Sequence, residues 1–258
     1  MNQSQLPIKK LLLNCDMGES LGPWSMGMDE QVMPLVDMAN IACGFHASDP
    51  VTMSRTVLLA KQSKTQIGAH PSYPDLIGFG RRSMQCTSLE IISMVQYQIG
   101  ALDGICRAHD VRVEYVKPHG ALYNDMMRDV DILRAVLEAI ASYDNSLPLM
   151  VLASTDNRKT ESIAAEFGIK LLFEAFADRA YEDNGLLRPR TQDGAVYHSE
   201  QQILEQALLL ATEGSVISRN GQRLKLDADT LCVHGDNAES VKAVRHIRNS
   251  LNKLYRLA

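Results

Sequence analysis

Residues 111–120 read VRVEYVKPHG, a largely apolar run that ends in a lysine, a proline, a histidine and a glycine. The run predicts a β-strand over 111–117, and its polar end predicts a place where the chain carries chemistry. A lysine that closes a strand beside a histidine supplies a fixed cation and a proton carrier together. The structural alternative for Lys117 is a salt bridge to Asp16 or Glu174 across the sheet, because an unpaired buried lysine is costly.

The same order, a strand-like run followed by polar residues, recurs on both sides of this stretch. Strands are predicted near residues 10–15, 37–43, 65–69, 111–117, 147–153, 169–174 and 229–234, with helices between them. Parallel neighbours need long connections, so this alternation predicts a parallel sheet with right-handed crossovers. We expect an α/β fold, an irregular seven-stranded βα barrel whose polar strand ends meet at one mouth. An open doubly wound sheet is the alternative, although no G-x-G-x-x-G segment follows the first strand.

Helix starts are predicted at polar residues that can cap a first turn. Thr87 with Glu90, and Ser199 with Gln202, have the spacing of capping boxes. Single caps are predicted at Asp49, Asp129 and Asn237.

Size and composition narrow the classes of function. A chain of 258 residues that is 45% hydrophobic fits one barrel domain over residues 1–258. A net charge of -5 and the lack of long Lys/Arg runs argue against nucleic-acid binding, and no apolar run is long enough for a membrane span. Five cysteines without a C-x-x-C pair favour a reducing compartment, so we expect a cytoplasmic protein.

Carboxylates and histidines follow the first three predicted strands. Asp16 and Glu19 lie in a glycine-containing turn, where they can serve as general base, substrate acceptors or metal ligands. Their structural alternative is a turn and helix start. His46 and His70 end the next two strands, and either one alone is typical of a satisfied hydrogen-bonding residue. On adjacent strands, however, their side chains would converge over the barrel mouth.

A second group of charged residues lies farther along the chain. Asp178 and Arg179 follow the sixth strand, where the guanidinium can bind a carboxylate or phosphate and the acid can orient it. Their alternative is a structural Asp–Arg pair. His234 and Asp236 end the last strand, and Asp236 is also a candidate helix start. Arg81 lies in a loop that can close over an anion or remain solvated.

These polar segments together form a long and specific pattern. They are NCDMGE at 14–19, ANIACGFHA at 39–47, GAHPSYPD at 68–75, FGRR at 79–82, VKPHGALYN at 116–124, FADRAY at 176–181 and CVHGD at 232–236. In them the chain closely resembles the LamB/YcsF family, from about residue 10 to about residue 250. Departures from the family pattern at Leu12, Ser48 and Arg188 leave the charged core intact.

The resemblance implies a barrel of the glycoside hydrolase/deacetylase type. It also implies ATP-dependent opening of the lactam of 5-oxo-L-proline to L-glutamate, together with partner subunits B and C. Because the chain has no G-x-x-x-x-G-K-[ST] loop, we expect ATP, the co-substrate, to be bound mainly through the partners.

Roles for individual residues follow from this reading. Lys117 and Arg179 are expected to hold an anionic intermediate, while Asp16 or a histidine activates water and another histidine protonates the leaving nitrogen. The expected catalytic residues are Asp16, His46, His70, Lys117 and His119. The expected substrate-binding residues are Asn14, Glu19, Asn40, Tyr73, Arg81, Glu174, Asp178, Arg179, His234 and Asp236.

Two other functions stay open at this point. One is a stand-alone metal-dependent amidase or deacetylase, with Asp16, His46 and His70 as ligands of a zinc or similar ion. The other is a non-catalytic subunit that binds a small carboxylic acid and regulates its partners. Whether a divalent metal takes part is not decided by the sequence, and the preferred assignment names no metal ligand.

Overall fold

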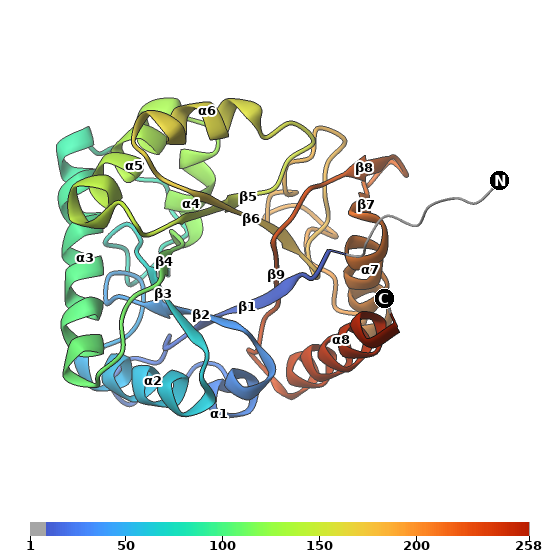
Figure 1. The fold of residues 1–258 in the computed structure, drawn as a ribbon, viewed down its shortest axis with the longest axis horizontal. Coiled ribbons are helices and arrows are strands. Elements are labelled where there is room, and N and C mark those ends of the chain that lie inside the picture. The colour runs from blue at the N-terminus through green and yellow to red at the C-terminus, as the bar shows by residue number, and fades with distance from the viewer. Residues whose placement is uncertain (1–8, 258) are drawn as a thin grey trace.

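The computed structural model describes residues 9–257, and within them seven parallel strands close into a barrel surrounded by helices (Figure 1). The order around the barrel is β1-β2-β3-β4-β5-β6-β9, and β9 returns to pair with β1. All seven predicted strands are present, so the expected α/β barrel is confirmed. The strands are β1 (Leu12–Met17), β2 (Met38–Ala42), β3 (Gln66–His70), β4 (Tyr115–Val116), β5 (Leu149–Leu152), β6 (Leu171–Phe176) and β9 (Thr230–Cys232).

Helices connect the strands and cover the outside of the barrel (Figure 1). They are α1 (Asp29–Val32), the 3-10 helix η1 (Met33–Leu35), α2 (Pro50–Ser63), α3 (Ser88–Ala108), α4 (Gly120–Met126), α5 (Val130–Asp144), α6 (Arg158–Glu166), α7 (Glu200–Glu213) and α8 (Ala238–Leu257). None of the helices in the described residues is long and apolar enough to cross a membrane.

Most predicted caps form as the sequence indicates. Asp49 and Asp129 accept hydrogen bonds from backbone N–H groups at the starts of α2 and α5, and Thr87 forms a complete capping box at α3. Asn237 Oδ1 likewise accepts from the Ser240 N–H. The capping box predicted at Ser199 was wrong, because the Ser199 side chain makes no cap hydrogen bond. The start of α7 is instead tied to α8 by an ion pair between its first residue, Glu200, and His246.

One element was not predicted, an antiparallel pair formed by β7 (Ser215–Ile217) and β8 (Arg223–Lys225). It lies between α7 and β9 in the chain and outside the barrel sheet. Each strand has three residues, too few for a period of two to stand out from the sequence.

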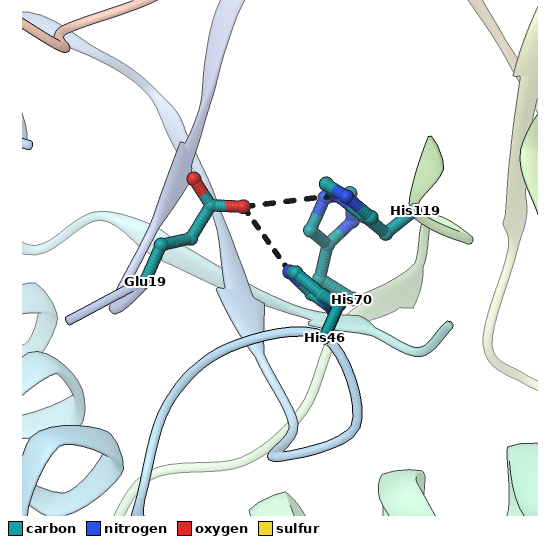
Figure 2. Close-up of side chains that lie close together, drawn as sticks. All are labelled: Glu19, His46, His70 and His119. Carbon is teal, nitrogen blue, oxygen red and sulfur yellow. Dashed lines mark hydrogen bonds and ion pairs between the residues drawn. The ribbon is translucent and has the colours of Figure 1, made fainter. Parts of the chain in front are cut away.

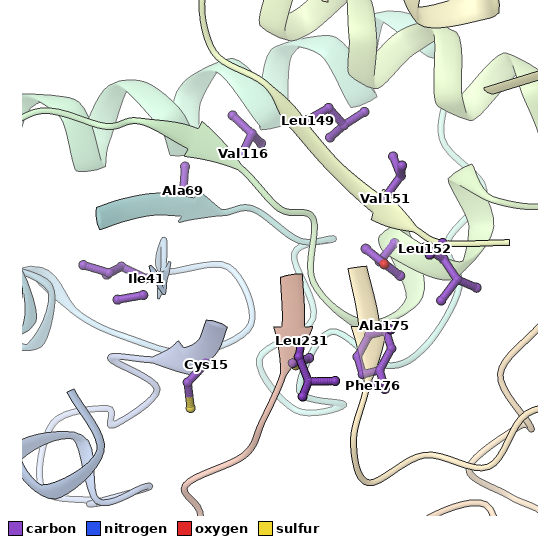
Figure 3. Close-up of a cluster of buried hydrophobic side chains, with 14 of the residues drawn as sticks. Cys15, Ile41, Ala69, Val116, Leu149, Val151, Leu152, Ala175, Phe176 and Leu231 are labelled. Atoms are coloured by element: carbon purple, nitrogen blue, oxygen red, sulfur yellow. The ribbon is translucent and has the colours of Figure 1, made fainter. Parts of the chain in front are cut away.

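Alternation along the strands divides the apolar core into two parts. Side chains such as Leu13 and Cys15 face outward into a large cluster under the helices, part of which is drawn in Figure 3. A separate small cluster consists of Met38, Tyr115 and Met150, with Leu12 and Leu172 packed against it. These five residues occupy the alternate strand positions and therefore fill the amino-terminal part of the barrel interior.

Gly68 makes room for this inner layer. It pairs with Tyr115 across the β3–β4 ladder, and a Cβ atom at position 68 would lie 2.1 Å from the Tyr115 ring. The glycine therefore lets the tyrosine cross the interior, where its hydroxyl reaches the polar residues of the next layer.

Candidate active site

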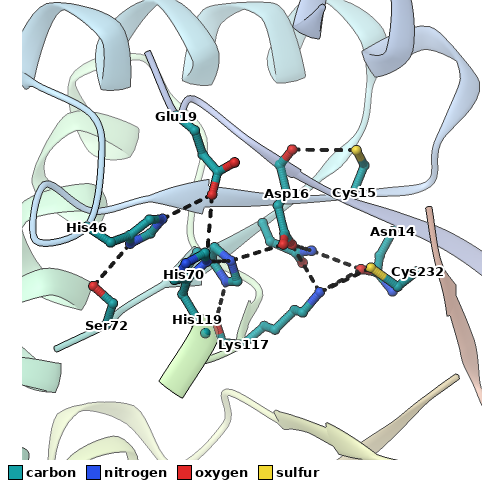
Figure 4. A network of polar contacts seen from close by, with 12 residues as sticks. Asn14, Cys15, Asp16, Glu19, His46, His70, Ser72, Lys117, His119 and Cys232 are labelled. Atoms are coloured by element: carbon teal, nitrogen blue, oxygen red, sulfur yellow. Dashed lines mark hydrogen bonds and ion pairs between the residues drawn. The ribbon is translucent and has the colours of Figure 1, made fainter. Parts of the chain in front are cut away.

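A network of polar side chains (Figure 4) follows the small apolar cluster of Met38, Tyr115 and Met150 toward the carboxyl ends of the strands. Asn14 and Asp16 are the next inward residues of β1 after Leu12, and Asn40 follows Met38 in β2. Asp16 is paired in register with Asn40. Alternate residues of each strand face the barrel interior, so the alternation that forms the inner apolar cluster also places these polar side chains there.

Lys117 is the centre of this layer. Its Nζ lies 3.0 Å from Asp16 Oδ1, 2.7 Å from Glu174 Oε1 and 3.2 Å from Asn14 Oδ1. Lys117 is 3% exposed and Glu174 is fully buried. Burial alone would lower the pKa of Lys117, but the Asp16, Cys232 and Glu174 groups raise it well above its usual value. Both salt bridges considered as the structural alternative are therefore present, and they hold a charged lysine in the interior.

Amide and hydroxyl groups complete the layer. Asn40 Nδ2 donates to Asn14 Oδ1 (2.9 Å) and to Asp16 Oδ1 (2.8 Å), and the Tyr115 hydroxyl donates to Asn40 Oδ1 (2.7 Å). Asn14 Nδ2 donates to Thr230 Oγ1 on β9 (2.9 Å). Sequence reasoning missed Tyr115 and Thr230. Tyr115 precedes Lys117 by two residues on a strand, and that spacing is the signal that could have revealed it.

Three histidines and a glutamate gather at the mouth (Figure 2). His46 Nε2 lies 3.1 Å from Glu19 Oε1, and His119 Nδ1 lies 3.6 Å from the same oxygen. His70 Nε2 is 3.0 Å from His119 Nδ1, and the His46 and His119 rings stack with centroids 3.7 Å apart. One ligand atom from each of these four residues lies within 4.8 Å of the others, so this group can hold a metal ion.

The metal ligands suggested by the sequence differ from this group. Asp16, His46 and His70 were the ligands of the alternative amidase hypothesis, whereas the structure gathers Glu19 and His119 with the two histidines. Asp16 directs Oδ1 to Lys117 instead. The change follows from Gly18, whose positive φ of 70° turns the chain after β1 and allows Glu19 to approach the imidazoles.

Asp16 connects the two clusters, because its Oδ2 lies 3.4 Å from His70 Nε2. Burial by itself would raise the pKa of Asp16, but His70 and Lys117 hold it well below its usual range. Burial, with the charge of Asp16, raises the pKa of Glu19 to about 7. Two carboxyl groups three residues apart thus have opposite tendencies to hold a proton.

Burial also lowers the pKa of two of the histidines, His46 and His119. It lowers the pKa of His46 well below the usual value, and the neighbouring His70 lowers it further. The pKa of His119 is lowered well below its usual value by burial and by the two other histidines. Both imidazoles are therefore neutral near pH 7 and present lone pairs rather than positive charge.

The loop after β3 shapes the histidine cluster from above. The Phe79 carbonyl accepts a hydrogen bond from His119 Nε2 (2.9 Å), and the next residue, Gly80, has a positive φ of 63°. A Cβ atom at position 80 would lie 2.8 Å from both His46 Cβ and His119 Cδ2. Gly80 is thus required both by its backbone conformation and by the close approach of the rings.

Asp178 and His234 form a separate, partly buried pair, with Asp178 Oδ2 2.7 Å from His234 Nδ1. Burial would lower the pKa of His234, but the Asp178 carboxylate raises it to about 8. Neither the expected orientation of Arg179 by Asp178 nor the alternative of a structural Asp178–Arg179 pair is found. The Arg179 guanidinium donates to the carbonyl oxygens of Ala195 (3.1 Å) and Arg188 (2.6 Å), and so braces the following loop.

Three other expected binding residues lie around these clusters. The Tyr73 hydroxyl donates to Asp125 Oδ2 (3.3 Å), so its polar end is committed to α4 rather than to the histidines. Arg81 is exposed, with its guanidinium 5.0 Å from the centroid of the Phe79 ring. Asp236 is exposed after β9.

The Lys117 layer and the histidine cluster are joined through Asp16 and suit different chemical steps. The Lys117 layer fixes an ionised carboxylate, Asp16, against the histidines. The imidazoles and Glu19 can bind a cation or move protons to and from water or a leaving group.

Comparisons with known proteins agree with this architecture. The model of the LamB/YcsF family matches residues 11–256. The chain is 58% identical over 247 residues to the 5-oxoprolinase A subunit numbered 2 of Pseudomonas putida, covering 96% of each chain. It is 57% identical over 246 residues to the 5-oxoprolinase A subunit of Vibrio vulnificus, covering 95% of this chain and 99% of the relative.

A solved structure shows the same fold. The crystal structure of a lactam utilization protein from Thermus thermophilus superimposes with a TM-score of 0.88 at 39% identity, covering 95% of this chain and 97% of that one. The family match and these relatives extend over nearly all of the barrel. The chain therefore belongs to the LamB/YcsF family.

Proposed function

We propose that this chain is the A subunit of an ATP-dependent 5-oxoprolinase, which opens 5-oxo-L-proline to L-glutamate together with subunits B and C. The proteins that are more than half identical to it over most of its length are named as A subunits of 5-oxoprolinase. The observation in the chain itself that carries the proposal is the buried Lys117–Asp16 pair set directly against the histidine cluster.

The reaction needs ATP because a five-membered lactam is a stable amide. Transfer of the terminal phosphoryl group to the lactam oxygen makes the carbonyl carbon more electrophilic. Water then adds to this carbon, and the C–N bond breaks as the nitrogen takes a proton, which leaves a γ-glutamyl phosphate. A second water hydrolyses this acyl phosphate to the γ-carboxylate of L-glutamate and inorganic phosphate. We assign ATP binding mainly to the partner subunits, since no phosphate-binding G-x-x-x-x-G-K-[ST] segment occurs in this chain.

We assign proton transfer to Asp16, which lies beside the histidine cluster. Asp16 is fixed by Lys117 and Asn40 on one oxygen, while its other oxygen faces His70. The Lys117 ammonium group donates to Asn14 Oδ1, Asp16 Oδ1 and Cys232 Sγ, and it forms an ion pair with Glu174. Lys117 therefore acts as a positioning residue through Asp16, rather than as a direct contact to the anionic intermediate.

We assign recognition of the substrate's carboxylate to the exposed Arg81, at the rim beside Phe79. Arg179 is less suited to that role because backbone carbonyls already occupy its guanidinium. The use of ATP and the presence of five free thiols in the described residues support placing the enzyme in the cytoplasm.

Reconstitution tests the proposal. The purified chain is combined with subunits B and C, ATP and 5-oxo-L-proline, and glutamate is measured over time. We expect turnover by the complex, almost none by the chain alone, and a fall in kcat of about 100-fold or more for Asp16→Asn. The matched control Asp227→Asn changes an exposed carboxylate and should leave kcat unchanged.

Complex formation is followed in parallel by size-exclusion chromatography. An Asp16→Asn protein that assembles normally but lacks turnover excludes a purely regulatory role. Full activity of that assembled variant would remove Asp16 from the mechanism, and lactam hydrolysis by the chain alone without ATP would favour the stand-alone amidase.

A further inference from the structure

The histidine cluster has a hydrogen-bonding arrangement that fixes which ring nitrogens carry protons. His70 Nδ1 lies 2.6 Å from the Lys117 carbonyl oxygen, and His119 Nε2 lies 2.9 Å from the Phe79 carbonyl oxygen. A carbonyl oxygen only accepts, so both nitrogens must donate. The remaining nitrogens, His70 Nε2 and His119 Nδ1, therefore carry the lone pairs when the rings are neutral.

The third histidine follows the same rule. His46 Nδ1 lies 3.1 Å from Ser72 Oγ, and the Ser72 hydroxyl donates its single proton to the Tyr73 carbonyl oxygen (2.8 Å). Ser72 Oγ thus accepts from His46 Nδ1, which leaves the His46 lone pair on Nε2. That nitrogen is 3.1 Å from the Glu19 carboxylate.

Four acceptor atoms consequently face one another inside the cluster. The lone-pair nitrogens of His70 and His119 are 3.0 Å apart, and the Glu19 carboxylate lies close to the His46 and His119 rings. Lone pairs at such distances repel unless a positive charge lies between them. The surroundings are largely closed, since all three histidines are at most 5% exposed.

We propose that Glu19, His46, His70 and His119 form a binding site for one divalent transition-metal ion, with Zn²⁺ as the reference ion. Ligand atoms about 2.0–2.1 Å from a tetrahedral zinc ion lie about 3.3 Å from each other. Three of the separations, 3.0, 3.1 and 3.6 Å, bracket this value, and all four ligand atoms lie within 4.8 Å of one another. Three imidazoles and one carboxylate are also a donor set that suits zinc and its neighbours.

The outer contacts match those of metal-binding histidines. Such residues almost always donate their second ring N–H to a carbonyl, a carboxylate or water, which fixes the tautomer and the ring orientation. Here His70 and His119 donate to main-chain carbonyls and His46 to a serine hydroxyl. The site is thus supported from the loop after β3 and from the end of β4, outside the set of ligands itself.

Metal binding by the full chain, purified without a histidine tag or chelator, tests the inference separately from lactam turnover. We expect one equivalent of Zn²⁺ by elemental analysis, and a Co²⁺ titration that produces visible d–d absorption and saturates at one equivalent. Glu19→Gln and His119→Ala should each weaken Zn²⁺ binding by at least about 10-fold. The control His198→Gln alters an exposed histidine and should bind as the wild type does.

A second measurement needs no substitution. Long-range ¹⁵N–¹H NMR of the imidazoles reports which nitrogen is protonated and which one responds to added Zn²⁺. We expect Zn²⁺ to shift Nε2 of His46 and His70 but Nδ1 of His119. Substoichiometric metal with unshifted cluster resonances, or equal Zn²⁺ affinity in folded Glu19→Gln and His119→Ala proteins, would show that protons alone balance this cluster.

Discussion

The two polar clusters at the barrel mouth are neighbours but differ in how their hydrogen-bonding groups are matched. Around Lys117, the ammonium group donates to Asn14, Asp16 and Cys232, and its positive charge lies between the Asp16 and Glu174 carboxylates. Around His46, His70 and His119, acceptor atoms face one another. The difference indicates that the charge of the first cluster is already balanced within the protein, whereas the second cluster is arranged to bind a cation.

The largest effect is expected from removing the charge at the centre of the matched cluster. Lys117→Met leaves the partly buried Asp16 and the fully buried Glu174 carboxylates without their cation, so the free energy of unfolding should fall by about 3–5 kcal/mol. Urea denaturation measures this. The control Lys9→Met breaks exposed pairs and should cost less than about 1 kcal/mol. Equal losses for the two variants would mean that the Lys117 cluster is not electrostatically balanced.

A smaller effect should follow from crowding the histidines while the lysine cluster is left intact. Gly80→Ala forces alanine into a left-handed conformation and places a methyl group 2.8 Å from His46 and His119. We expect a loss of about 2–3 kcal/mol in stability, together with weaker Zn²⁺ binding. Gly221→Ala has a similar positive φ in open space and should cost only about 1 kcal/mol. Identical effects of the two changes on Zn²⁺ binding would contradict the crowding argument.

The Asp178–His234 contact is a third case, because it is an ion pair only while His234 carries a proton. The pKa of His234 in the folded protein, about 8, lies above its unfolded value of about 6.5. Its contribution is therefore fully present below about pH 6.5 and is lost as the pH rises through 8, a change of about 2 kcal/mol. Unfolding free energies of the wild type and His234→Gln, compared at about pH 6 and pH 9, test this. A difference between the proteins that does not shrink at the higher pH would refute the assignment.

The smallest effect should come from one outer contact of the histidine cluster. Ser72→Ala removes the acceptor of His46 Nδ1 and should cost about 1 kcal/mol in stability. It also frees the His46 tautomer, so the imidazole NMR signals of His46 should change while those of His70 keep their Nδ1–H form. An unchanged His46 tautomer would show that Ser72 does not set it.

The barrel and the polar layer follow closely from the sequence, because period-two alternation determines which residues share the interior. Asn14, Asp16 and Lys117 were expected at strand ends, and they lie together in the interior for that reason. The directions of long side chains and turns are harder to predict, because they depend on contacts between residues that are far apart in the sequence. Arg179 follows a strand as expected, yet its guanidinium is held by carbonyls of a loop that the sequence does not position.

The grouping of Glu19 and His119 with His46 and His70 could not be predicted for a related reason. Distances between different strand-end loops depend on the barrel's register and on the turn at Gly18, neither of which is visible in one sequence. Tyr115 was within reach of prediction, because its spacing from Lys117 places both on one face of the strand.

Closure of the barrel through β9 has a consequence for how the protein is made. Thr230 binds Asn14 across 216 positions of the chain, and β9 is the strand that joins β6 to β1. During synthesis on the ribosome, Lys117 and Asp16 therefore emerge long before β9, the strand that closes the barrel around them. Nascent chains that stop short of residue 230 should remain open and dependent on chaperones until the final strand is released.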